Sequence, residues 1–195
     1  MDRGMATGRA ERKPVSQLDN NGVIIRMLFT VNHLSRWLSP IHEDVRLQRA
    51  PSRSERSPKD IQIAMRNEEL RIFPKMHAIA VQDRPDLDRL PPIVADEAAL
   101  AFDQQAAVLE IMAEFRRLRQ STTSLLRTLP DAAWQRDGIS RVERDWTIRQ
   151  LAEHLVETDE RLMAEMDRAL ERSGARDSIA KVSRARIDEL QRLAP

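Results

Sequence analysis

Apolar residues recur every three or four positions along most of the chain, which is the spacing of one face of a helix. The first stripe runs from Val23 to Leu38 and ends at Ser39-Pro40, because the residue before a proline is pushed away from helical geometry. Further stripes predict helices over 57–79, 96–129, 147–173 and 177–193. Neither an alternating strand pattern nor an internal repeat is present. The chain is therefore predicted to be all-α, an antiparallel four-helix bundle with a core of Leu, Ile, Met and Phe.

Two of these helices carry clear start signals. Ser57 can cap a helix in which Pro58 takes the first position and Asp60 lies in the first turn. Thr147 and Gln150 have the three-residue spacing of a capping box. Pro74 lies inside the second helix, where the missing backbone donor predicts a kink or a break.

The pattern also suggests how the chain is divided. We expect residues 1–21 to form a flexible N-terminal segment, 22–174 to form the bundle, and 175–195 to form an added C-terminal helical extension. The stretch 40–56 is polar and rich in arginine, which is typical of a loop.

Composition excludes several classes of protein. The 195 residues include no cysteine and only four histidines, which rules out a disulfide scaffold and any cysteine-ligated metal site. No apolar run reaches the ~20 residues of a membrane span, and residues 1–22 lack the apolar core of a signal peptide. We therefore expect a cytoplasmic protein with no membrane contact.

Charge gives no general drive toward nucleic acid, because the net charge is only +1. It is unevenly distributed, however, with 11 basic and 6 acidic residues over positions 1–59. The basic excess falls in the N-terminal segment and in the loop around Arg46 to Arg56. We expect solvated charge there, and weak contact with a polyanion through the N-terminal segment is the alternative.

Several motifs in the second half of the chain resemble the DinB-like family of four-helix bundles, also called DinB/YfiT-like metalloenzymes. The resemblance rests on the segments 115–119, 126–134 and 146–155, together with Gly138, Asp159 and the stretch 163–170. Residues 57–64, Glu69, Phe73 and Arg84-Pro85 resemble the family's second helix and the connection after it. The resemblance covers most of residues 23–172. It implies a left-handed up-up-down-down bundle, and because many members are dimeric we expect a homodimer.

Many members of this family bind zinc or nickel with three histidines, one on the second helix and two spaced four apart on the fourth. Some use the metal to activate a thiol cofactor for transfer or isomerisation, and others are hydrolases. In this sequence the three ligand positions align with Ala64, Thr158 and Leu162. Alanine and leucine cannot coordinate a metal, and a neutral threonine hydroxyl is a poor ligand. The resemblance therefore implies a degenerate site, and we expect neither a metal nor another cofactor.

Polar residues near that position remain candidates for a pocket lining. His154, Thr158 and Asp159 interrupt the apolar stripe of the fourth helix, and Glu68 or Glu69 could face inward from the second. The alternatives are a histidine bonded within the core and a surface salt bridge of these glutamates with Arg66 or Arg71. The full set of candidate pocket-lining residues is Ala64, Glu68, Glu69, His154, Thr158, Asp159 and Leu162.

Trp134 and Trp146 flank the 135–145 connection, where they could either stack on a ligand or anchor the connection to the bundle. We expect a metal-free module that binds a small apolar ligand or mediates dimerisation. The alternative is a metal-dependent hydrolase, or a thiol-dependent transferase or isomerase, with a relocated site between the second and fourth helices. Such a site would require Glu69, His77 and His154 to converge.

Overall fold

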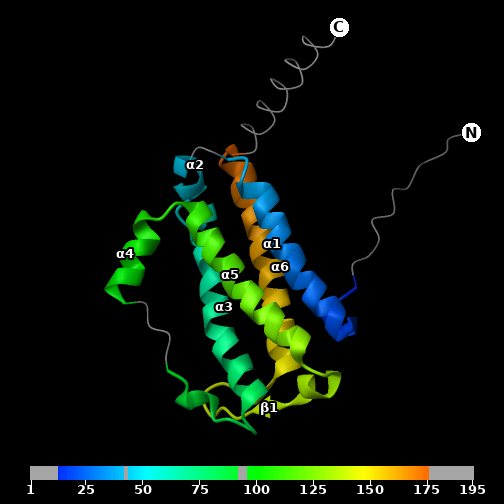
Figure 1. Ribbon diagram of the computed structural model, residues 1–195. Helices are drawn as coiled ribbons and strands as arrows, with labels where there is room; N and C mark the ends of the chain where they lie inside the picture. Colours follow the sequence, from blue (N-terminus) through cyan, green and yellow to red (C-terminus); the bar gives the residue numbers. More distant parts are fainter. Residues whose placement is uncertain (1–12, 42–43, 92–95, 176–195) are drawn as a thin grey trace, which may run out of the picture.

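The computed structural model describes residues 13–41, 44–91 and 96–175. Its body consists of four long helices, α1 (Asn20–Leu38), α3 (Pro58–Val81), α5 (Val108–Thr128) and α6 (Ile148–Arg172), shown in Figure 1. The predicted all-α four-helix bundle is therefore confirmed. The predicted helix over 177–193 and most of the N-terminal segment lie outside the described residues.

Polar contacts between the helices establish their directions. Asn20 and Arg26 of α1 contact Arg149 and Glu160 of α6 in the same order along the chain, so these two helices are parallel. On α3, Arg66 and Glu69 contact Glu114 and Arg119 of α5, again in parallel order. The α3–α6 pair is antiparallel, as is the α1–α5 pair (Figure 1). In chain order, α1, α3, α5 and α6 therefore run up, down, down, up, so the up-up-down-down order that the resemblance implied is wrong.

The helix starts follow the sequence signals. The Ser57 side chain accepts a hydrogen bond from the Asp60 amide, and the Asp60 side chain accepts one from the Ser57 amide, which completes a capping box. Thr147 and Gln150 form the same arrangement at the start of α6. Each box supplies partners for amides that the first helical turn leaves without one.

The single helix expected over 96–129 is wrong. The chain forms a short helix, α4 (Glu97–Gln105), leaves helical geometry at Ala106-Ala107, and restarts as α5, where Glu110 accepts a hydrogen bond from the Ala107 amide. No residue of α4 is buried, and α4 projects to the side of the bundle (Figure 1). The apolar period continues across the break, so the sequence pattern could not reveal it.

The break considered at Pro74 does not occur. Helix α3 is continuous from Pro58 to Val81, because Ile72, Met76 and Ile79 on either side of the proline are fully buried in the core. Packing of this apolar face compensates for the backbone hydrogen bond that the proline cannot donate.

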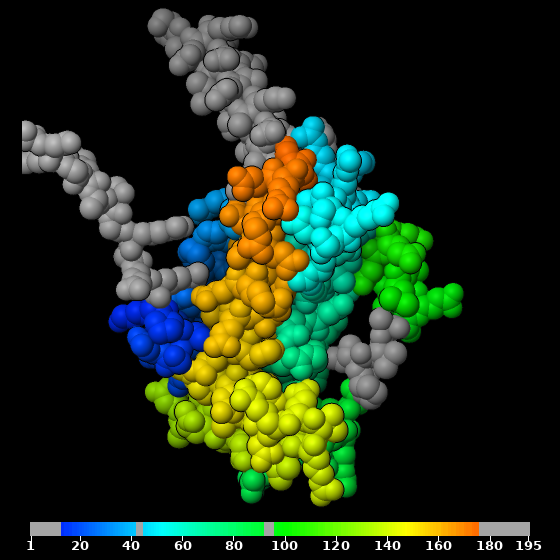
Figure 2. Space-filling model, turned by 180° about the vertical axis from the view of Figure 1, so that it is seen from behind, coloured from blue at the N-terminus to red at the C-terminus, as the bar shows by residue number. Residues whose placement is uncertain are grey.

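Short elements complete the fold. They are the 3-10 turns η1 (Val15–Gln17), η2 (Leu87–Arg89) and η3 (Asp131–Gln135), the helix α2 (Asp44–Gln48), and the strands β1 (Asp137–Gly138) and β2 (Trp146–Thr147). The sequence predicted neither α2, within the expected 40–56 loop, nor the strands, which pair antiparallel over two residues only. Figure 2 shows the face formed by α6 and α3, with the 137–147 segment across one end.

The packed body begins earlier than the boundary expected at residue 22. Val15 is buried within the core that contains Val23 and Met27, and Asp19 caps α1 by accepting a hydrogen bond from the Gly22 amide. At the same end of the bundle, a Cβ on Gly138 would lie 2.8 Å from Leu87 Cδ2, so glycine allows β1 to approach η2 closely. Among the described residues, no helix is both long and apolar enough to cross a membrane.

Candidate functional site

A buried arginine lies at the centre of the bundle and contacts all four long helices. Arg119 of α5 donates from Nε to Glu69 Oε2 of α3 over 2.8 Å. It binds both oxygens of Asp159 of α6, at 2.6 and 3.1 Å, and its Nη1 also donates to the Met27 carbonyl of α1 over 3.3 Å. Thr122 donates its hydroxyl proton to the other oxygen of Glu69. We call Arg119, Glu69 and Asp159 the central triad.

The central triad is shielded from water, with Glu69 0%, Arg119 1% and Asp159 3% exposed. Burial alone would lower the pKa of Arg119, but the charges of Asp159 and Glu69 outweigh burial and raise it, so the guanidinium stays charged. Because every member is bonded within the triad or to a neighbouring helix, Glu69 and Asp159 are not available to a ligand. Their role is to position the helices.

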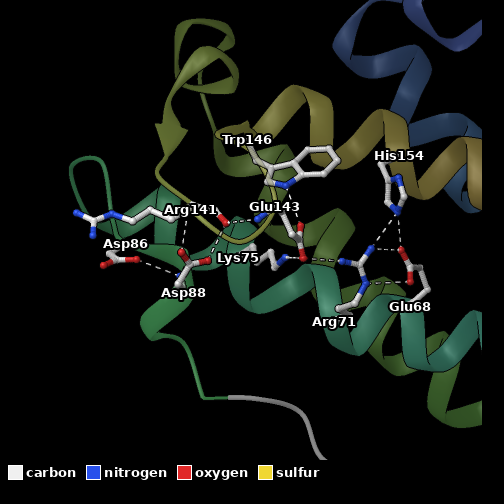
Figure 3. Close-up of polar contacts among 10 residues, drawn as sticks. Glu68, Arg71, Lys75, Asp86, Asp88, Arg141, Glu143, Trp146 and His154 are labelled. Atoms are coloured by element: carbon white, nitrogen blue, oxygen red, sulfur yellow. Dashed lines mark hydrogen bonds and ion pairs between the residues drawn. The ribbon is translucent and has the colours of Figure 1, made fainter.

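A second polar cluster lies near the surface between α3 and α6. His154 Nε2 is 2.6 Å from Glu68 Oε1, and Arg71 donates to both oxygens of Glu68 at 2.6 and 3.1 Å (Figure 3). Burial would raise the pKa of Glu68, but the hydrogen bonds from His154 and Arg71 outweigh it and lower that pKa to about 2. A carboxylate so stabilised is a poor general base at neutral pH.

This cluster continues into the segment between β1 and β2. Glu143 accepts hydrogen bonds from Lys75 at 2.7 Å, from Trp146 Nε1 at 3.0 Å and from Arg71 at 3.4 Å (Figure 3). The hydrogen bond from Lys75 is the main cause that lowers the pKa of Glu143. These contacts attach the segment to α3.

The two tryptophans that flank this segment are buried, Trp134 at 1% and Trp146 at 7% exposed. Both belong to the core cluster at this end of the bundle, and the Arg144 guanidinium lies over the Trp146 ring at 3.9 Å. Two roles were considered for these tryptophans, ligand stacking and anchoring of the 135–145 connection. Their burial supports the anchoring role.

A pocket of about 860 Å³ opens beside the polar cluster around Glu68, against α3, α4 and α5, and Glu68, Arg71, Lys75 and Glu143 lie on its wall. Its apolar wall comes from α3, α4, α5 and the stretch after α3, and consists of Ala64, Leu70, Pro74, Leu87, Leu90, Pro91, Ala99, Phe102 and Leu118. The sequence placed a pocket between α3 and α6, whereas this one lies between α3 and α5. The projection of α4 from the bundle, which the sequence did not reveal, supplies one side of it.

The seven residues expected to line one pocket fall in three environments. Ala64 and Glu68 lie on the wall of the observed pocket. His154 and Thr158 are half-buried on α6, and His154 contacts Glu68. The remaining three, Glu69, Asp159 and Leu162, are buried in the interior of the bundle.

Comparison with known proteins identifies the fold. No family model and none of the curated proteins matches the chain. Among solved structures, YfiT from Bacillus subtilis, described as a probable metal-dependent hydrolase with an unusual four-helix bundle topology, matches with a TM-score of 0.67. That match has 16% identity and covers 84% of this chain and 94% of YfiT. The protein has the DinB-like fold.

A second DinB-like neighbour is a histidine-to-alanine mutant of mycothiol-dependent maleylpyruvate isomerase, with a TM-score of 0.56 and 11% identity. The match covers 80% of this chain but 62% of the isomerase, so this chain spans less than two thirds of that protein.

The side chains at the expected metal position do not fit a metal ion. Ala64, Thr158 and Leu162 offer no imidazole or carboxylate, and Leu162 is packed in the apolar core at 1% exposed. The nearby pair of Glu68 and His154 is already bonded by Arg71, whose Nη2 lies 2.6 Å from Glu68 Oε1 and 3.1 Å from His154 Nε2. The Arg71 guanidinium therefore lies where a cation bound by Glu68 and His154 would lie. It already supplies the positive charge at that place. Across the described residues, no three His, Asp or Glu side chains form a group that could bind a metal.

The relocated site built from Glu69, His77 and His154 is wrong. His77 is exposed on α3, where its ring lies 6.0 Å from that of Phe73, while Glu69 is fully buried and bonded to Arg119. These side chains therefore point to different parts of the molecule. The residue that sequence reasoning missed is Arg119, although a charged residue directly after Leu118, within the apolar stripe that begins at Phe115, was a usable signal.

The central triad predicts a large loss of stability on substitution of Arg119. Arg119→Met leaves two buried carboxylates without their counter-charge, which costs about 3–5 kcal/mol. The triple variant Arg119→Met, Glu69→Gln, Asp159→Asn removes those charges and should recover much of the loss. Urea unfolding followed by circular dichroism measures both variants. Equal stability of Arg119→Met and the unmodified protein would contradict the role given to the triad.

The pKa of Glu68 predicts a specific dependence of stability on pH. Because folding lowers this pKa from its ordinary value of 4.5 to about 2, the stabilisation is fully present above about pH 4.5 and is lost as pH falls toward 2. Glu68→Gln should therefore be less stable than the unmodified protein at pH 7, and the difference should shrink between pH 5 and pH 2. Denaturant unfolding at each pH measures it, with Glu157→Gln on the exposed side of α6 as control. A difference that stays constant with pH would count against the assignment.

Proposed function

We propose that the protein is a binding module that accepts a small, largely apolar molecule in the pocket between α3, α4 and α5, without a metal ion. The observation that carries this proposal is the pocket itself, which at about 860 Å³ lies within the range of small-molecule sites, roughly 300–1,000 Å³.

The apolar half of the wall supports a ligand with an apolar body. Phe102 of α4 is 39% exposed and lines the pocket together with Leu118 of α5 and Leu70 of α3. Helix α4 contributes nothing to the bundle core, yet it is attached firmly: Asp103 receives two hydrogen bonds from Arg66 at 2.6 and 2.7 Å, and Lys59 Nζ donates to the Gln104 carbonyl at 2.9 Å. The helix is therefore positioned as a wall of the pocket.

The chemistry at the expected metal position supports a function without metal. YfiT is described as a probable metal-dependent hydrolase, but the residues of this chain at Ala64, Thr158 and Leu162 cannot ligate. The polar side chains near this position already form hydrogen bonds within the central triad and within the Glu68–His154–Arg71 cluster. The expected homodimer and the cytoplasmic location stay predictions.

Part of the basic excess that suggested contact with a polyanion is neutralised within the fold. Arg56 binds both oxygens of Glu165, at 2.9 and 2.5 Å, and Arg46 donates to the Gly174 carbonyl at 3.0 Å. The basic residues of positions 1–12 lie outside the described residues.

Binding of the neutral fluorescent probe N-phenyl-1-naphthylamine, in buffer with EDTA, tests the proposal. We expect saturable enhancement of fluorescence at one site. Phe102→Ala should weaken binding about five-fold, because it removes an aromatic wall worth about 1 kcal/mol of contact with the probe. Phe102 is partly exposed and on a helix outside the core, so this variant should remain folded.

The matched control is Phe29→Ala, which removes an exposed phenylalanine from α1, away from the pocket. This variant should bind the probe as the unmodified protein does. The proposal is overturned if binding requires added zinc or nickel, if no saturable binding occurs, or if Phe102→Ala binds as tightly as the unmodified protein.

A further inference from the structure

One charged residue on the pocket wall differs from the others. Arg117 of α5 is exposed and lines the pocket, and within the described part of the chain no carboxylate pairs with its guanidinium. Its backbone carbonyl accepts a hydrogen bond from the Ser121 hydroxyl, one turn further along the same wall. Arg117 therefore lies at the pocket with a guanidinium that no described carboxylate neutralises.

The other basic residues of the wall are neutralised. Arg66 is bonded to Asp103 and lies 3.1 Å from Glu114, Arg71 is bonded to Glu68, and Lys75 to Glu143. The wall thus holds four basic side chains and the carboxylates of Glu68, Glu114 and Glu143. Only Arg117 contributes positive charge that the protein itself does not balance there.

We propose that the ligand is an amphipathic monocarboxylic acid whose carboxylate binds Arg117 while its apolar body lies against Leu118 and Phe102. This inference rests on the proposed function and adds the chemical class of the ligand. A guanidinium matches the two oxygens of a carboxylate with two parallel N–H donors, which gives both attraction and orientation. Arg117 and Leu118 both line the pocket from α5, so the charge and part of the apolar wall come from the same helix.

The same balance of charge disfavours ligands with several negative charges. A phosphate monoester would carry a second negative charge, which no unpaired basic side chain of the wall would balance. One unpaired arginine balances one carboxylate, so a monoanion is the charge state that the pocket neutralises.

Competition against N-phenyl-1-naphthylamine tests this inference with octanoate and 1-octanol, which share an apolar body and differ in the head group. Arg117→Gln should raise the octanoate concentration needed for half-displacement about five-fold, because a partly solvated ion pair contributes about 1 kcal/mol. The same variant should leave displacement by 1-octanol unchanged. Octyl phosphate should compete less well than octanoate with the unmodified protein.

Arg116→Gln is the matched control, since Arg116 is the exposed neighbour on α5 that does not line the pocket. It should change neither competition. The inference is overturned if Arg117→Gln leaves octanoate displacement unchanged, weakens both competitors equally, or if octyl phosphate competes better than octanoate. In those cases the probe still binds and the proposed function stands, whereas absence of probe binding would overturn both.

Discussion

The ion pairing of Arg119 with Glu69 and Asp159 is the constraint on which the rest of the structure depends. Arg119 contacts α1, α3 and α6 from α5, and the triad is almost completely removed from water. A buried charge tolerates little displacement, because each lost hydrogen bond leaves a desolvated group without a partner. The triad thereby fixes the register of the helices, while the apolar clusters above and below it supply most of the driving force for folding.

This constraint also determines where a ligand can bind. The polar groups that face the interior between α3 and α6 are already satisfied, and Arg71 fills the space between Glu68 and His154. The α3–α5 side is different, because α4 projects from the bundle and is attached to α3 by hydrogen bonds from Arg66 and Lys59. The result is a DinB-like scaffold whose pocket is lined from α3, α4 and α5, including Ala64, while Thr158 and Leu162 of α6 do not line it.

The sequence predicted the long helices better than it predicted the position of the pocket or the contacts of the buried polar residues. Period and capping signals located the long helices, because Ser57 and Thr147 act locally and the apolar faces are continuous. The break at Ala106-Ala107 was missed, since neither residue is a breaker and the period runs through it. The pocket depends on that break and on contacts between residues far apart in sequence, such as Arg66 with Asp103. Asp159 and Glu69 were recognised as unusual, but their partner Arg119 could be identified only from the packing of the helices.

The most direct test of the account is to locate the ligand on the folded protein. The full chain is labelled with nitrogen-15 and titrated with N-phenyl-1-naphthylamine in the presence of EDTA, and the amide chemical shifts are followed by NMR. We expect the shifts to change at residues of the pocket wall, at Leu70, Phe102 and Ser121. The amides of Thr158 and Leu162 on the α6 side should stay in place. Changes confined to that side, or changes that appear only after zinc is added, would contradict the account.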